Sequence, residues 1–152
     1  MNTSFSTQLI LMADDDDDDR LLAQDALSES KAGGALRFVE NGEELMDYLC
    51  RRGKYQEGGK APRPGLILLD LNMPLKDGRE ALKEIKSDPD LKRIPVVVLT
   101  TSKADTDVGA IYELGANSFI SKPFQFDALV NVMKSIAQYW LRTVELPQAK
   151  NA

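Results

Sequence analysis

Five short apolar runs recur along the chain, and three of them contain almost no polar residue. Continuous apolar runs of this length are typical of strands that are buried on both faces of a parallel sheet. Between the runs, apolar residues recur with the spacing of amphipathic helices. The runs are LILMA (9–13), ALRFV (35–39), GLILLD (65–70), PVVVLT (95–100) and NSFIS (117–121).

The alternation of strand and helix patterns, repeated five times, predicts an α/β fold. We expect a doubly wound, five-stranded parallel sheet with helices on both faces. One helical stripe covers residues 41–50, where Cys50 is expected to be a buried apolar residue, and the longest covers 126–140. Ligands of such sheets bind beyond the carboxyl ends of the strands, so we look for site residues there.

Composition removes several classes of function. The 152 residues, 43% of them hydrophobic, make one domain with a core of its own. The absence of histidine excludes Ser-His-Asp and Cys-His catalysis and histidine-bound zinc. A net charge of −5 argues against a nucleic-acid surface. No apolar stretch approaches the ~20 residues of a membrane span, and a lone cysteine favours a reducing, cytoplasmic location.

Polar side chains gather where the predicted strands end. Asp14 and Asp15 follow the first run, and Asp70 ends the third. Three carboxylates at one edge need a cation or a proton among them, and all-oxygen ligands suit Mg²⁺. The Asp70 carboxylate can attack phosphorus to form an acyl phosphate. Thr100, which ends the fourth run, and Lys122, which follows the fifth, can bond the phosphoryl group.

The acidic pair opens a run of six aspartates, residues 14–19. A calcium loop of the EF-hand type starting there needs Gly at its sixth place and Glu at its twelfth. Asp19 and Asp25 stand at those places, which excludes this kind of site.

The later aspartates of the run are expected to belong to the start of a helix. Asp18 is the predicted N-cap, and its side chain would accept hydrogen bonds from backbone N–H groups. The predicted role of Asp16, Asp17 and Asp19 is that of solvated charges near the positive end of the helix dipole.

The string DLNMPLKDG (70–78), the acidic pair, Thr100 and Lys122-Pro123 together resemble the receiver domain of two-component response regulators. The resemblance implies the CheY-like, flavodoxin-like fold with strand order 2-1-3-4-5. It covers the chain from about residue 9 to residue 140. The stretch at 63–102 and the ending YWLRTVELP (139–147) are most similar to stand-alone response regulators associated with cyanobacterial and bacterial phytochromes.

The resemblance implies a role for each matching residue. Asp70 would be the phosphoacceptor, and Asp14, Asp15 and Asp70 would bind Mg²⁺ together with the backbone carbonyl of Asn72. Some relatives have one more residue between the acidic pair and the arginine that opens the first helix. Counting back from Arg20 gives the pair Asp14–Asp15, which we favour, whereas the longer spacing gives Ala13–Asp14.

Further roles follow from the same resemblance. Lys122 and Thr100 would hold the phosphoryl group, and Thr100 and Phe119 would move together as a switch. The bond between Lys122 and Pro123 is expected to be cis. Asn72 and Ser102 would tune a slow hydrolysis of the acyl phosphate.

The implied function is that of a signalling phosphoacceptor rather than an enzyme. A sensor histidine kinase, with a phytochrome kinase as the implied type, would phosphorylate it, and protein contacts would carry the signal, without nucleic acid or membrane. A homodimer through the fourth and fifth helices is implied. The expected divisions are a polar leader (1–8), the receiver domain (9–141) and a tail without an output domain (142–152).

Two other functions stay open at this point. A hydrolase of the haloacid-dehalogenase type also has an aspartate after an apolar strand, but it needs a second aspartate where Asn72 stands. A degenerate receiver that only binds partners would require a lost acidic residue. The aromatic pair Tyr139 and Trp140 either closes the core or forms an exposed patch for a partner.

Overall fold

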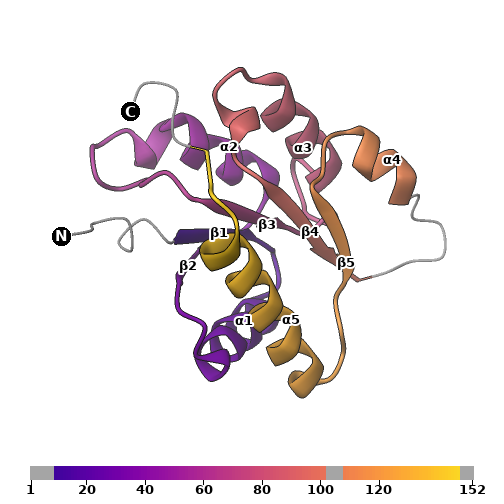
Figure 1. The fold of residues 1–152 in the computed structure, drawn as a ribbon. Coiled ribbons are helices and arrows are strands. Elements are labelled where there is room, and N and C mark those ends of the chain that lie inside the picture. The colour runs from indigo at the N-terminus through magenta and orange to yellow at the C-terminus, as the bar shows by residue number, and fades with distance from the viewer. Residues whose placement is uncertain (1–8, 102–107, 148–152) are drawn as a thin grey trace.

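The computed structural model describes residues 9–101 and 108–147. Five parallel strands form one sheet in the order β2-β1-β3-β4-β5, so the predicted fold class and strand order are confirmed (Figure 1). The leader 1–8, Ser102 and the end of the tail, 148–152, lie outside the described residues. The strands are β1 (Leu9–Ala13), β2 (Ala35–Val39), β3 (Leu66–Leu69), β4 (Val96–Thr100) and β5 (Ser118–Ser121).

The helices cover both faces of the sheet, as the alternating pattern predicts. Helices α1 and α5 lie against one face, and α2 and α3 against the other (Figure 1). A short helix, α4, packs beside the edge strand β5. The helices are α1 (Asp17–Ser30), α2 (Gly42–Cys50), α3 (Gly78–Ser87), α4 (Val108–Glu113) and α5 (Phe126–Gln138), which continues as a π-helical turn (Tyr139–Thr143).

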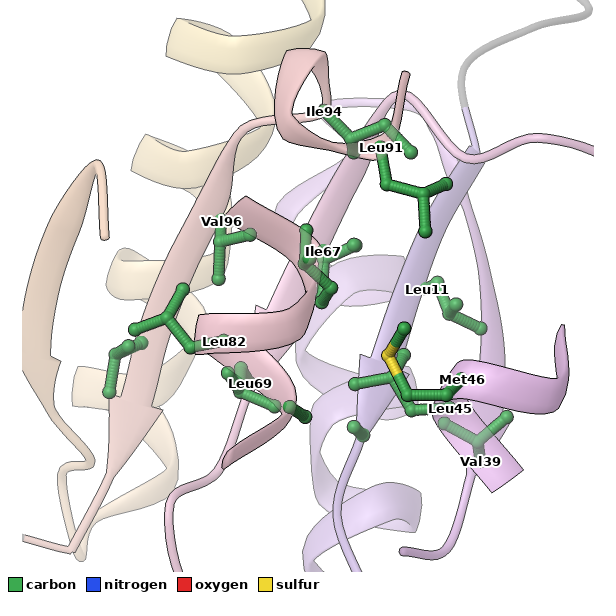
Figure 2. Packing of buried hydrophobic residues seen from close by; sticks show 14 of the residues in the cluster. Leu11, Val39, Leu45, Met46, Ile67, Leu69, Leu82, Leu91, Ile94 and Val96 are labelled. Carbon is green, nitrogen blue, oxygen red and sulfur yellow. The ribbon is translucent and has the colours of Figure 1, made fainter. Parts of the chain in front are cut away.

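The sheet separates two apolar cores. Strands β1, β3 and β4 are buried at every position, whereas the edge strands β2 and β5 are only partly covered. This explains why three of the five runs contain almost no polar residue. Alternate strand residues point into opposite cores. Figure 2 shows the core under α2 and α3, where Leu11, Ile67 and Val96 of the sheet meet Leu45 and Leu82 of the helices.

The other core, under α1 and α5, also takes in the aromatic pair at the end of α5. Trp140 packs against this core, while Tyr139 is 51% exposed and makes an edge-to-face contact with Trp140 at 5.1 Å. Trp140 therefore helps to close the core, and Tyr139 is the exposed aromatic residue of the pair.

Strand register brings the predicted site residues to one edge of the sheet. Ala13 pairs with Leu69, so the residues that follow them, Asp14 and Asp70, lie side by side. At the other side of β3, Thr100 pairs with Ser121, and the Thr100 carbonyl accepts a hydrogen bond from the Lys122 backbone N–H at 2.8 Å.

The long loop between α2 and β3 is held by hydrogen bonds near the amino ends of the strands. Its backbone carbonyls accept hydrogen bonds from the Tyr48 hydroxyl, at Pro62, and from the Arg51 guanidinium, at Ala61. Cys50, the last residue of α2, is exposed, contrary to the prediction of burial. The helix ends there, so the side chain lies beyond the packed face.

The start of α1 differs from the prediction by two residues. Asp16, and not Asp18, is the N-cap, and its side chain accepts hydrogen bonds from the N–H groups of Asp18 and Asp19 at 2.8 and 3.1 Å. Six identical residues carry no internal pattern that marks the cap. The helix therefore begins at Asp17, and Asp19 lies in its first turn.

Replacing Asp16 with alanine is expected to lower the free energy of unfolding by about 1 kcal/mol, because two backbone donors lose their acceptor. Asp18→Ala removes an exposed aspartate whose side chain does not cap the helix, so it should change stability by less than about 0.5 kcal/mol. Urea denaturation of both variants measures the difference. Equal losses in the two variants would contradict this assignment of the cap.

Candidate functional site

Four polar side chains are enclosed at the carboxyl edge of the central strands. Asp14 is 0%, Asp70 8% and Thr100 1% exposed, in a layer that is otherwise apolar. The Lys122 side chain is 10% exposed. Charged groups are seldom buried without partners, so their contacts decide what this edge can do.

Asp70 is held from two sides. Its Oδ1 accepts hydrogen bonds from the Thr100 hydroxyl at 2.6 Å and from the Asn72 backbone N–H at 3.1 Å. Its Oδ2 lies 3.5 Å from the Lys122 ammonium. These contacts fix the orientation of the carboxylate while one oxygen stays directed toward a positive charge.

Lys122 binds two aspartates more closely than it binds Asp70. Its ammonium lies 2.7 Å from Asp14 Oδ2 and 2.9 Å from Asp19 Oδ2. Burial by itself would lower the pKa of Lys122, but the hydrogen bonds and charges of Asp14, Asp19 and Asp70 raise the pKa above its ordinary value. Lys122 is thus a permanent cation of the site.

Asp14 is fixed by its own backbone neighbourhood. Its Oδ1 accepts the Asp16 N–H at 2.9 Å, and its carbonyl accepts the Arg20 guanidinium at 2.7 Å. Burial raises the pKa of the Asp14 carboxyl, and the hydrogen bond from Lys122 opposes this effect. A bound cation would compensate the buried charge more fully than one shared ammonium does.

Three carboxylates have the arrangement that a divalent cation requires. One oxygen each of Asp14, Asp15 and Asp70 lies within 4.8 Å of the other two. This all-oxygen donor set is typical of Mg²⁺ or a similar hard ion, and the exposed position of Asp15 leaves room for water ligands. Ala13 is wholly buried in the core, so the arrangement supports the pair Asp14–Asp15 over Ala13–Asp14.

The predicted cis bond before Pro123 is wrong. The described residues contain no cis peptide bond, so Lys122 and Pro123 are joined in trans. The trans form of such a bond is favoured by about 0.5–1 kcal/mol. With this isomer the Lys122 ammonium already reaches Asp14 and Asp19.

The outer parts of the site agree with the sequence less closely. Asp19 was expected to be solvated, yet it forms an ion pair with Lys122. Phe119 packs against the core under α2 and α3 but is only partly buried, and its N–H donates to the Tyr112 hydroxyl at 3.1 Å. The sequence does contain a signal for this contact. Asp19 is an acidic residue near the predicted start of a helix, and Lys122 is a basic residue at the end of a predicted strand, so the two could have been expected to pair.

Comparison with known proteins shows which family the chain is similar to. The family model described as "Response regulator receiver domain" matches residues 10–134. Response regulator Rcp1 of Synechocystis sp. is 46% identical over 142 residues, which cover 93% of this chain and 95% of that protein.

Two solved structures are similar over nearly their whole length. The phosphorylated cyanobacterial phytochrome response regulator RcpA has a TM-score of 0.83 and 45% identity, covering 93% of this chain and 99% of that one. The Mn²⁺-bound form of Rcp1 has a TM-score of 0.82, 45% identity and the same coverage. Receiver domains are phosphoacceptor signalling modules that bind a divalent metal ion, and the acidic group at this sheet edge fits such an ion. The chain belongs to the response regulator receiver domain family.

Proposed function

We propose that Asp70 accepts a phosphoryl group from a sensor histidine kinase and that the phosphorylated protein signals through protein contacts. The observation that best supports this function is the position of the Asp70 carboxylate. It is oriented by Thr100, faces Lys122 and lies beside two further carboxylates. A phytochrome kinase is the proposed donor, because the similar structures are of phytochrome response regulators.

The phosphoryl transfer needs a nucleophile and neutralisation of the charge on the phosphoryl oxygens. A carboxylate oxygen of Asp70 forms the new P–O bond while the P–N bond of the kinase phosphohistidine breaks and the electron pair returns to the imidazole. A Mg²⁺ ion held by Asp14, Asp15, Asp70 and the Asn72 carbonyl would supply positive charge for the phosphoryl oxygens. Lys122 pairs with one such oxygen, and the Thr100 hydroxyl can turn from Asp70 to another.

The output proposed is a rearrangement on the α4–β5 side of the domain. Movement of Thr100 toward the phosphoryl group would leave space that the ring of Phe119, which is only partly buried, can enter. Partner proteins, or a second copy bound through α4 and α5, would recognise the changed surface. Hydrolysis of the acyl phosphate would be slow, with Asn72 and Ser102 tuning its rate.

The location proposed is the cytoplasm, because the protein would have to meet the phosphohistidine of its kinase there. None of the helices in residues 9–101 and 108–147 is long and apolar enough to cross a bilayer. The proposed domain limits are 9–141, with the leader 1–8 before them and the tail 142–152 after them.

Incubation with Mg²⁺ and acetyl phosphate tests this function. Intact-mass spectrometry should show one added phosphoryl group on the wild type and none on Asp70→Asn, because the amide is not nucleophilic. Asp25→Asn, which changes an exposed aspartate of α1, is the matched control and should be labelled like the wild type.

Other outcomes identify the other functions. Rapid release of phosphate over many turnovers would indicate a hydrolase, and the lack of both adduct and release would indicate a degenerate receiver. Sedimentation of the labelled and unlabelled protein tests the dimer, and a monomer in both states at high concentration would contradict it.

A further inference from the structure

Lys122 has one carboxylate partner for which the phosphorylation scheme has no use. Its ammonium lies 2.7 Å from Asp14, 2.9 Å from Asp19 and 3.5 Å from Asp70. Asp14 and Asp70 belong to the group of carboxylates that can share a cation, and Asp19 does not. The role of Asp19 in the site therefore has to come from its contact with Lys122.

The position of Asp19 follows from the start of α1. Because Asp16 caps the helix and accepts the Asp19 N–H, Asp19 lies in the first turn of α1. Helical side chains lean toward the N-terminus, which directs the Asp19 carboxylate toward the sheet edge. With Asp18 as the cap, Asp19 would be the first helical residue instead of the third.

The ion pair lies in the wall of a pocket that apolar side chains also line. Asp19 and Lys122 both line a cavity of about 190 Å³, together with Leu22, Phe124 and Phe126. The side chains of Lys122 and Asp19 are 10% and 33% exposed. A pair with this little contact with water interacts more strongly than one on an open surface.

We propose that Asp19 is a positioning residue that acts through Lys122. Its carboxylate holds the Lys122 ammonium on the α1 side of the site, away from the phosphoryl group on Asp70. The proposal rests on phosphorylation of Asp70. In the resting state Lys122 is nearer to Asp14 and Asp19 than to Asp70, so it must shift to bond a phosphoryl oxygen.

Asp14, Asp19 and Asp70 compete for the Lys122 ammonium. A cation bound by Asp14, Asp15 and Asp70 would favour the contact of Lys122 with Asp19. The cation draws the negative charge of Asp14 and Asp70 toward itself and away from the ammonium. Asp19 then remains the carboxylate partner that keeps Lys122 on the α1 side. Asp19 thereby slows the loading of the site.

The test is the rate of Asp70 labelling by acetyl phosphate at saturating Mg²⁺. Asp19→Asn, which keeps the shape and removes the charge, should increase the rate about fivefold, the effect of one modest ion pair. Asp19→Glu should return it toward the wild-type rate, and Asp18→Asn, an exposed neighbour, should leave the rate unchanged. Thermal unfolding of each variant verifies that it is folded.

A double-mutant cycle shows whether Asp19 acts through Lys122. Lys122→Met removes the ammonium, and in this background Asp19→Asn should change the labelling rate by less than twofold. A full acceleration there, an unchanged rate in the single variant or a slower one would each overturn the proposal. If the wild type takes up no phosphoryl group, the proposed function itself fails, and the inference with it.

Discussion

Asp14→Asn is expected to weaken Mg²⁺ binding by at least about 100-fold and to stop labelling of Asp70 at millimolar Mg²⁺. Loss of an outer partner of a metal ligand already weakens binding by 10–100-fold, so loss of a ligand charge should do at least as much. Asp14 is fully buried and belongs to the group of three carboxylates. Calorimetric titration measures the affinity, and intact mass measures the labelling.

The loss in this variant should not come from unfolding. Burial raises the pKa of the Asp14 carboxyl, so the charged form is unfavourable in the folded protein without a cation. A neutral amide should therefore leave the free energy of unfolding equal to or above that of the wild type. Asp18→Asn makes the same change outside the group and should bind Mg²⁺ normally. Normal affinity in Asp14→Asn would show that the metal lies elsewhere.

Gly78→Ala is expected to lower the free energy of unfolding by about 3 kcal/mol and to impair labelling of Asp70. A Cβ at Gly78 would overlap the Asp70 carbonyl oxygen and lie 2.7 Å from the Leu71 Cα. Both are backbone atoms, so the added methyl group can fit only if the chain that carries the phosphoacceptor moves. The Gly78 N–H also donates to the Leu71 carbonyl at 2.9 Å, which fixes the start of α3 against this chain.

Thermal unfolding should show a midpoint lowered by about 10 °C for a protein of this size. Gly58→Ala is the matched control, because a Cβ there meets nothing within 4 Å. Its stability should stay within about 0.5 kcal/mol of the wild type. The prediction would be contradicted if Gly78→Ala kept both the wild-type midpoint and the wild-type labelling rate. The close contact of Gly78 with the Asp70 backbone would then matter neither for stability nor for labelling.

Long-range features of this fold could be predicted because they repeat in the sequence. Three strands buried on both faces require mainly apolar residues, and β1, β3 and β4 have them at every position except Thr100, the last residue of β4. Parallel strands end at the same edge, so the convergence of Asp14, Asp70 and Lys122 needed only the order of the elements.

The details that could not be predicted depend on shifts of one or two residues. A run of identical aspartates contains no contrast, so the cap at Asp16 and the contact of Asp19 with Lys122 were set by packing of α1. The isomer before Pro123 depends on a small energy difference that tertiary contacts decide. Cys50 matched the apolar spacing of α2, but helical spacing does not tell where the last turn ends.

The exposed Cys50 gives the protein a natural attachment point for a spectroscopic probe. It is the single cysteine of the sequence, so a maleimide dye would label one position. The first residue of its helix, Gly42, contacts the Lys76 carbonyl in the loop after Asp70, and the helix then runs away from that edge. A dye at Cys50 would therefore report the docking of a kinase by fluorescence anisotropy while leaving the phosphorylated edge unobstructed.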